Sequence, residues 1–153
     1  MRVLVARVGK GHNDWADQAC ADYLRRIRSL KVEELLLKPA VFRGDEAAVR
    51  SEEGRRLLEL LGPGDRLVTL DERGELPGSE PFAGWIDASV REGVGRLVFA
   101  IGGPYGHDPR LRERAWRVLA VARWVTNHEI ARLCLVEQLY RASTLLWGGA
   151  YHH

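Results

Sequence analysis

The chain has 153 residues, of which 46% are hydrophobic, and this is enough apolar material for one compact domain with a buried core. No apolar run approaches the roughly 20 residues of a membrane helix, and the first residues resemble a strand rather than a signal peptide. We therefore expect one domain over residues 1–153 in the cytoplasm, with no membrane association.

Strand-like and helix-like segments alternate along the whole chain. In chain order, the pattern predicts a strand at Val3–Val8, a helix from Asn13 or Asp14 to about Ser29, a strand at Val32–Leu37, a helix at Asp45–Leu61 ended by Gly62-Pro63-Gly64, a strand at Arg66–Leu70, a helix from Pro81 to near Gly93, a strand at Leu97–Ile101, a short helix at 108–115, a strand at Val118–Ala122 and a helix at His128–Leu146. Continuous apolar strands separated by helices are typical of a parallel sheet covered on both faces. The predicted fold class is therefore α/β.

In open α/β sheets, ligands bind beyond the carboxyl ends of the strands, which points to the loops at 9–14, 71–80, 102–107 and 122–128. The first of these loops resembles a dinucleotide-binding fingerprint, but Asp14 stands where the third glycine is needed. Gly102 and Gly103 directly follow an apolar strand and would let a ligand approach the backbone, although a plain tight turn has the same pattern. The residues Thr69–Gly74 and Val121–Asn127 also follow predicted strands. Together with the Gly102 loop, these segments would form a binding site for a nucleoside at one edge of the sheet.

The last predicted helix is apolar on every side, through Ile130, Ala131, Leu133, Cys134, Leu135, Val136, Leu139, Ala142, Leu145 and Leu146. Because a helix that is apolar all round is enclosed by protein, we expect it to lie between its own domain and a second subunit. Glu137 and Arg141 interrupt this surface, and their i, i+4 spacing also fits an ordinary ion pair within the helix.

Charge is unevenly distributed along the chain. The formal net charge is only +2, but residues 107–153 carry seven arginines against four acidic residues. This asymmetry favours a polyanionic partner for the C-terminal part, although solvated arginines on a helix face give the same count.

The cysteines and histidines do not form a metal-binding pattern. Cys20 and Cys134 lie in separate helical segments without CxxC spacing, and the five histidines never cluster at zinc spacing. We expect two reduced, buried thiols and no metal site.

An ordered set of short motifs resembles the RlmH family, small methyltransferases of the SPOUT class, over the whole chain. The matching residues are Val8-Gly9-Lys10, Tyr23-Leu24-Arg25-Arg26, Glu53-Gly54, Thr69-Leu70-Asp71 with Gly74, Ile101-Gly102-Gly103-Pro104 with Gly106, His128, Arg132, Glu137-Gln138-Leu139-Tyr140-Arg141-Ala142 and Tyr151-His152. Family members usually carry Thr, an aromatic or aliphatic residue and Pro before the matching histidine, whereas Val125-Thr126-Asn127 precede His128 here.

The resemblance implies a trefoil-knotted α/β fold, a homodimer, and S-adenosylmethionine as the cofactor. It implies that three loops of the knot bind this cofactor, and the positions carried over are Leu70, Gly102, Gly103, Val121, Ala122, Arg123, Trp124, Val125 and Thr126. The implied reaction is methylation of N3 of a pseudouridine in a stem-loop of 23S rRNA within the assembled ribosome.

The C-terminal tail supplies the expected catalytic residues. N3 of pseudouridine must lose a proton, and His152 is the first candidate for the base because histidine side chains titrate near neutral pH. The tail, including Tyr151, would alternatively close over the RNA as a clamp, and Arg141 is a further candidate. Because a terminal tail usually makes few core contacts, we expect it to contribute little to stability.

Two other functions fit the same residues. One is a SPOUT methyltransferase that acts on tRNA, and the other is a non-catalytic, ribosome-associated factor that binds RNA through the C-terminal arginines. Binding of S-adenosylmethionine distinguishes the second of these, and the RNA that accepts the methyl group distinguishes the first. A chain this small without an appended RNA-binding domain favours rRNA in its ribosomal context.

Overall fold

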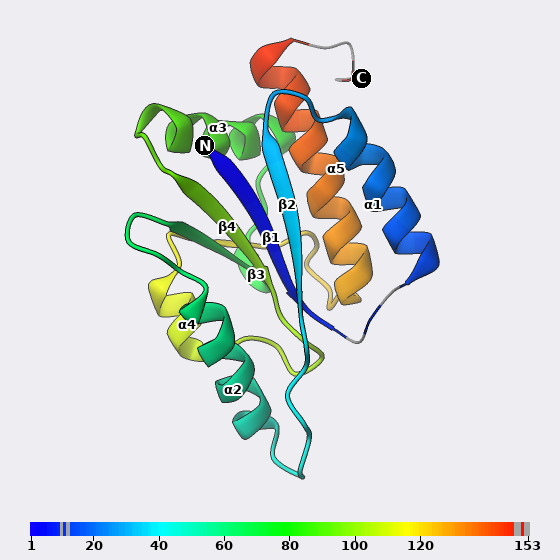
Figure 1. Ribbon diagram of the computed structural model, residues 1–153, viewed down its shortest axis with the longest axis vertical. Helices are drawn as coiled ribbons and strands as arrows, with labels where there is room; N and C mark the ends of the chain where they lie inside the picture. The colour runs from blue at the N-terminus through cyan, green and yellow to red at the C-terminus, as the bar shows by residue number, and fades with distance from the viewer. Residues whose placement is uncertain (10, 12, 149–150, 152–153) are drawn as a thin grey trace.

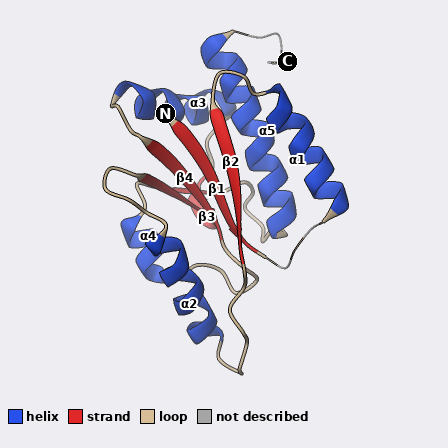
Figure 2. Ribbon diagram, viewed as in Figure 1, coloured by secondary structure: helices blue, strands red, loops and turns tan. Residues whose placement is uncertain are grey.

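The computed structural model describes residues 1–9, 11, 13–148 and 151, which form a five-stranded parallel sheet between helices (Figure 1). The elements are β1 (Arg2–Val8), α1 (Asp14–Arg26), β2 (Lys31–Leu37), α2 (Glu46–Glu59), β3 (Arg66–Glu75), α3 (Ser79–Arg91), β4 (Arg96–Ile101), α4 (Pro109–Arg114), β5 (Arg117–Leu119) and α5 (His128–Trp147). The strand order is β2-β1-β4-β3-β5, and Figure 2 shows the strands β2, β1 and β4 side by side. The α/β class and the predicted order of elements are confirmed.

Side chains of β1 alternate between two cores, one on each face of the sheet. Val3 and Val5 pack in the core that contains residues of α3 and α5, whereas Leu4, Ala6 and Val8 pack against residues of α2 and α4. Figure 1 shows the corresponding layers, with α1, α3 and α5 on one side of the sheet and α2 and α4 on the other. Each fully buried aliphatic side chain contributes about 1.5–3 kcal/mol, so these two layers supply most of the driving force for folding.

Side-chain caps fix where three of the helices begin. The Asp45 carboxylate accepts hydrogen bonds from the N–H groups of Ala47 and Ala48, the second and third residues of α2. The Asp108 carboxylate caps α4, and the Asn127 side chain accepts the N–H of Glu129 at 2.8 Å at the start of α5. Such caps contribute about 1 kcal/mol each, and the last two also define the ends of loops that lie beyond the sheet edge.

The end of β3 crosses β5 at very close range. Leu70 and Glu75 of β3 both pair with Leu119, and the N–H of Ala120 donates to the carbonyl oxygen of Glu75 at 2.7 Å. A Cβ atom added to Gly74 would lie 2.5 Å from the carbonyl oxygen of Val118. Backbone therefore meets backbone at this crossing, and only glycine fits there.

The crossing explains where the observed strands differ from the predicted ones. β3 continues to Glu75, so part of the predicted 71–80 loop is strand, and β5 covers only Arg117–Leu119 rather than Val118–Ala122. After Leu119 the chain leaves the ladder to pass Glu75. Helix α1 ends at Arg26 rather than near Ser29 because Ile27 adopts an extended conformation with φ −75° and ψ 110°.

We expect Gly74→Ala to destabilise the protein by about 2 kcal/mol or more, because the new methyl group meets main-chain atoms that cannot rotate away. Gly84→Ala is the matched control, since a Cβ atom at this position of α3 meets nothing within 4 Å. Gly84→Ala should stabilise by up to about 1 kcal/mol through helix propensity. Urea unfolding of both variants measures the difference, and equal stabilities would contradict the role assigned to Gly74.

Candidate functional site

A cavity of about 620 Å³ lies beyond the carboxyl ends of β4 and β5 and beside the second half of β3. Its wall consists of residues 70–73 of β3, residues 101–107 at and after the end of β4, and several residues between β5 and the first turns of α5. The structure brings together eight of the nine positions expected to bind a cofactor, namely Leu70, Gly102, Gly103, Val121, Ala122, Trp124, Val125 and Thr126. The described residues of the 9–14 loop do not line this cavity.

The backs of Gly102 and Gly103 are covered by protein. A Cβ atom on Gly102 would lie 3.2 Å from the His107 ring, and one on Gly103 would lie 2.8 Å from Oε2 of Glu53. Both neighbours are buried, with 8% and 3% of their surface exposed. The two glycines are therefore needed so that the loop can pack on this ring and this carboxylate, in addition to any close approach by a ligand.

The Glu53 carboxyl group joins two loops at this edge. Its Oε1 accepts the N–H of Ala40 at 3.0 Å, and its Oε2 has no hydrogen-bond partner among the residues that the structure describes. Burial raises the pKa of this carboxyl group. Glu53 thus holds the segment after β2 against the Gly103 loop.

The cavity wall carries a firmly ionised aspartate. The Arg73 guanidinium donates two hydrogen bonds to Asp71, at 2.9 and 2.8 Å, and holds the pKa of this carboxyl group at about 2. His107 has the opposite environment, because burial lowers its pKa while its Nε2 donates to the carbonyl oxygen of Ala100 at 3.2 Å. The wall therefore combines a fixed negative charge with a neutral imidazole.

The loop between β5 and α5 presents its side chains outward. Trp124 and Val125 are 74% and 83% exposed, and the Thr126 hydroxyl donates to the carbonyl oxygen of Trp124 at 3.3 Å. Arg123 lies outside the cavity wall, and its guanidinium donates to the carbonyl oxygen of Gly74 at 2.9 Å. Arg123 therefore ties this loop to the crossing of β3 over β5.

A buried ion network anchors the first turns of α5 to the sheet. Nη1 of Arg7, on β1, donates to Oε1 of Glu129 at 2.7 Å, and both side chains are only 6% exposed. Nη1 of Arg132 donates to Glu129 at 3.1 Å. The remaining contacts of Arg132 are with Asp17 at 2.6 Å and with both carboxylate oxygens of Glu34 at 2.7 and 2.8 Å. Removing one member of such a network costs about 3–5 kcal/mol, so the start of α5 has one strongly preferred position.

Arg141 and Tyr151, the two expected catalytic residues that the structure describes, do not line the cavity of their own chain. Arg141 forms the intrahelical ion pair with Glu137, at 2.6 Å, and its guanidinium lies 4.7 Å from the centre of the Tyr151 ring. Since α5 has 20 residues, it is about 30 Å long, and Tyr151 follows the end that is remote from the cavity (Figure 1). His152 lies outside the described residues.

Tyr151 is packed against the domain. Its ring lies 4.7 Å from that of Tyr140 and 5.2 Å from the Arg26 guanidinium, and its hydroxyl is 3.4 Å from that of Tyr23. The expectation that the tail makes few contacts is therefore wrong for Tyr151. A ring and cation cluster of this kind contributes about 0.5–2 kcal/mol, so removing Tyr151 will also lower stability.

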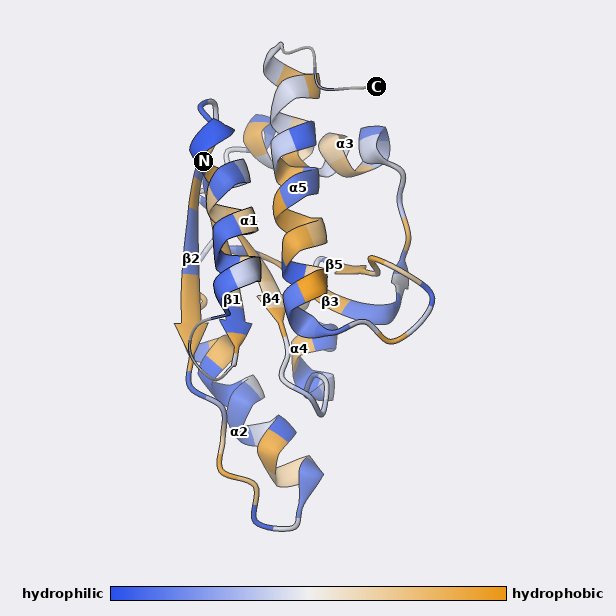
Figure 3. Ribbon diagram, turned by 90° about the vertical axis from the view of Figure 1, so that its right-hand side faces the viewer, coloured by the Kyte–Doolittle hydropathy of each residue, from blue (hydrophilic) through white to orange (hydrophobic). Residues whose placement is uncertain are grey.

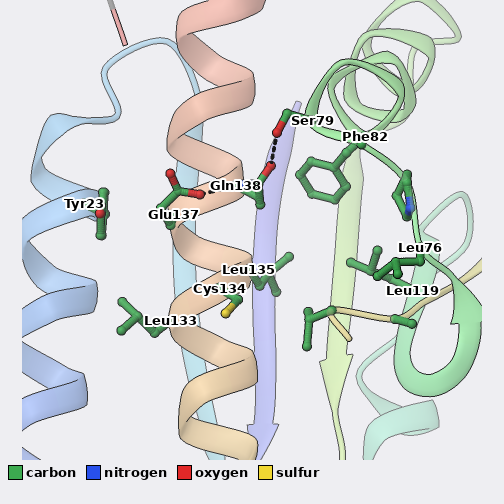
Figure 4. Close-up of a pocket in the computed structure, with 14 residues that line it drawn as sticks. Tyr23, Leu76, Ser79, Phe82, Leu119, Leu133, Cys134, Leu135, Glu137 and Gln138 are labelled. Carbon is green, nitrogen blue, oxygen red and sulfur yellow. Dashed lines mark hydrogen bonds between the residues drawn. The ribbon is translucent and has the colours of Figure 1, made fainter. Parts of the chain in front are cut away.

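A second, apolar groove of about 440 Å³ lies between α5 and the segment that enters α3 (Figure 4). Cys134 and Leu135 of α5 lie toward Leu76 and Phe82, whereas Leu133 lies on the side of α5 next to α1. The Ser79 hydroxyl donates to Gln138 at 2.9 Å at one end of the groove. Helix α5 is thus not enclosed within one chain: Ile130 is 46% exposed, and Cys134 is exposed while Cys20 is buried. The prediction of two buried thiols is wrong for Cys134 in the single chain.

Sequence reasoning missed several residues of the site. Asp71 was named only as part of the Thr69-Leu70-Asp71 motif, with no role of its own, and His107 was not singled out because a lone histidine in a loop carries no pattern. Arg7 did leave a signal, since it stands alone as a charged residue in the apolar segment Val3–Val8 and lies buried at 5% exposure. A charge in a central strand requires a buried partner, and the partner of Arg7 is Glu129.

Two classes of feature are not found in the described part of the chain. No group of three or more His, Cys, Asp or Glu side chains is arranged to hold a metal ion. No helix there combines the length and apolar character needed to cross a membrane.

Known proteins resemble this chain over its full length. The family model described as a predicted SPOUT methyltransferase matches residues 1–152. A ribosomal RNA large subunit methyltransferase H from Geotalea uraniireducens is 39% identical over 153 residues, covering all of both chains. Relatives with the same name are 50% identical over 111 residues in Brucella anthropi, covering 72% of this chain and 69% of the relative, and 35% identical over 156 residues in Porphyromonas gingivalis, covering 100% and 99%.

If the cavity binds S-adenosylmethionine, as the family resemblance implies, Gly103→Ala should weaken this binding by roughly tenfold or more, because the methyl group collides with Glu53 and displaces the loop. Glu53→Asp withdraws the carboxylate by one methylene, so the double variant should regain much of the affinity, while Glu53→Asp alone serves as the control. Titration calorimetry measures all three. Wild-type affinity in Gly103→Ala would show that the packing of this loop on Glu53 does not shape the site.

Proposed function

The chain belongs to the SPOUT methyltransferase family, and from this membership we propose that it transfers a methyl group from S-adenosylmethionine to ribosomal RNA of the large subunit. The proposed acceptor is N3 of a pseudouridine in a 23S rRNA stem-loop of the assembled ribosome. The observation that carries the proposal is the cavity between three loops, in a chain whose full-length relatives are named as large-subunit methyltransferases.

The cavity suits the proposed cofactor chemically. Leu70, Ile101 and Val121 offer apolar surface for an adenine ring, and the glycine loop offers backbone groups. The ionised Asp71, which is paired with Arg73 in the same wall, offers carboxylate oxygens to ribose hydroxyls. When bound, S-adenosylmethionine supplies an electrophilic methyl group. The close crossing at Gly74 further supports the proposal that the chain is knotted around this cavity.

We further propose a homodimer in which a second copy covers the apolar groove. Figure 3 shows the hydrophobic N-terminal half of α5, where Ile130 and Cys134 are exposed. Leu119 and Val121 line both the groove and the cavity, so a partner seated in the groove borders the cavity as well. Dimers of identical chains usually have two-fold symmetry, which places the same groove on both sides of the interface.

Two-fold symmetry would solve the problem posed by the remote tail. If the two α5 helices run antiparallel, the end of each helix lies near the start of the other, where the partner's cavity opens. Tyr151 packs beside Tyr140, about 18 Å along α5 from His128 in the wall of its own cavity, and the antiparallel arrangement would bring it to the cavity of the other copy. We therefore propose that each active site combines the cavity of one chain with Arg141, Tyr151 and His152 of the other.

The protein's own groups then have separate tasks. The cavity loops orient the methyl donor, and positioning of this kind accounts for much of the catalysis in a displacement reaction. Arg141 and Tyr151 hold the nucleotide over the cavity and exclude water. The N3–H proton must leave as the N3–methyl bond forms, and His152 is the proposed acceptor of that proton.

We expect the purified protein to transfer labelled methyl groups from S-adenosylmethionine to 70S ribosomes and little or none to tRNA. Free 23S rRNA and 50S subunits define how much ribosomal context is needed, and mapping the product locates the methyl group. Transfer to tRNA alone would identify the second candidate, a tRNA methyltransferase. Failure to bind S-adenosylmethionine would instead indicate a non-catalytic RNA-binding factor.

Mixed dimers test whether the site is shared. A chain that lacks residues 150–153 and a chain with Gly102→Val should each be inactive, because one loses the tail and the other the cavity. After unfolding and refolding together, about half of the dimers are mixed, and each mixed dimer contains one complete site. We expect the mixture to recover roughly a quarter of wild-type methyl transfer. A mixture as inactive as its components would place tail and cavity of the same chain together.

A further inference from the structure

An aromatic pair lies at the rim of the cavity, on a segment that the proposed reaction does not use. Phe42, in the segment between β2 and α2, is 51% exposed. Its ring stacks on that of Tyr105, with the centroids 5.5 Å apart and the planes 21° from parallel. Because Tyr105 lines the cavity, Phe42 forms an outer aromatic layer beside the opening.

The structure fixes this layer in place. Ala40, two residues before Phe42, donates its N–H to Glu53 at 3.0 Å, and Glu53 in turn packs against Gly103. The segment that carries Phe42 is therefore joined to the glycine loop at two points, the carboxylate of Glu53 and the ring of Tyr105. An exposed ring held rigidly beside a binding cavity requires no ordering when a ligand stacks on it.

Two cations lie close to Phe42 in the chain. Lys38 is four residues before Phe42 and Arg43 directly follows it, both are exposed, and neither forms an ion pair with a carboxylate of the described residues. The neighbouring acids are engaged, since Asp45 caps α2 and Glu46 lies 3.8 Å from Arg50. An exposed aromatic ring with cations nearby in the chain is complementary to an unpaired nucleotide, because the base can stack on the ring and the phosphates can contact the cations.

We infer that Phe42, backed by Tyr105 and close in the chain to Lys38 and Arg43, is a stacking platform for an unpaired base of the RNA next to the nucleotide that is modified. This inference rests on the proposed function, because it takes the RNA substrate from it. The platform lies outside the cavity wall and adds affinity for RNA without contacting the methyl donor.

Four variants test the platform. Phe42→Leu keeps the apolar side chain but removes the flat ring, and Phe42→Trp restores a ring. Arg43→Ala removes one cation, and Arg28→Ala is its matched control, because Arg28 is also exposed but precedes β2, whereas Arg43 follows it. Binding to large ribosomal subunits is measured by co-sedimentation at several salt concentrations. The KM for ribosomes, the affinity for S-adenosylmethionine and the melting temperature are measured beside it.

Loss of one base–aromatic stack weakens RNA binding by roughly 5- to 100-fold. We therefore expect Phe42→Leu to bind subunits at least about fivefold more weakly and to show a matching rise in KM, with unchanged melting temperature and cofactor affinity. Phe42→Trp should bind as the wild type does. Arg43→Ala should reduce the slope of log affinity against log salt by about 1, and Arg28→Ala should not.

Wild-type subunit binding by Phe42→Leu would overturn the inference, and so would a loss of binding accompanied by dissociation of the dimer, which would make the ring a contact between copies. The proposed function fails separately. If the wild type binds subunits but transfers no methyl group, the reaction is wrong, while the co-sedimentation comparison still decides whether the platform exists.

Discussion

The close crossing of β3 over β5 is the constraint on which the rest of the site depends. With Gly74 against the backbone of Val118, the segment 70–73 is fixed directly above the point where β5 ends. The chain that leaves β5 must then pass Glu75, and Arg123 is bonded to the carbonyl oxygen of Gly74. Two of the three cavity loops are thus positioned by a single contact at which no side chain fits.

The buried ion network fixes the other end of the same loop. Arg7, Glu129 and Arg132 hold the first turns of α5 on the sheet, and Asn127 caps the helix immediately after the cavity loop. Apolar packing alone would allow α5 to slide or rotate, because hydrophobic contacts are not directional. Buried charges are stable only in the few arrangements in which they are paired. We therefore infer that the ion network fixes the position of α5 and, with it, the C-terminal end of the 120–127 loop. The position of Tyr151 depends on the length of α5, because the helix begins at the cavity and ends away from it.

Much of the fold could be predicted from the sequence because strands such as Leu97–Ile101 are continuous apolar runs with clear breakers on either side. Gly102 and the residues after β5 could be assigned to one site because parallel strands place their carboxyl ends at one edge. The backing of Gly103 by Glu53 could not be predicted, since those residues are 50 positions apart and no local pattern links them. The same holds for the stacking of Phe42 on Tyr105.

The packing of Tyr151 was missed because residues near a chain end usually make few contacts. Tyr151 instead contacts four aromatic and cationic side chains of its own domain. The exposure of Cys134 was missed because an apolar helical wheel does not say which part of the helix its own chain covers.

The central claim is that three loops joined at the Gly74 crossing form the binding site for S-adenosylmethionine. Hydrogen–deuterium exchange with and without this molecule tests it most directly, because the measurement reports on each loop separately. We predict slower exchange in residues 70–73, 102–107 and 121–126 together when S-adenosylmethionine is present, with α2 unchanged. Protection confined to the 9–14 loop, or no protection in any of the three cavity loops at saturating concentration, would contradict the account.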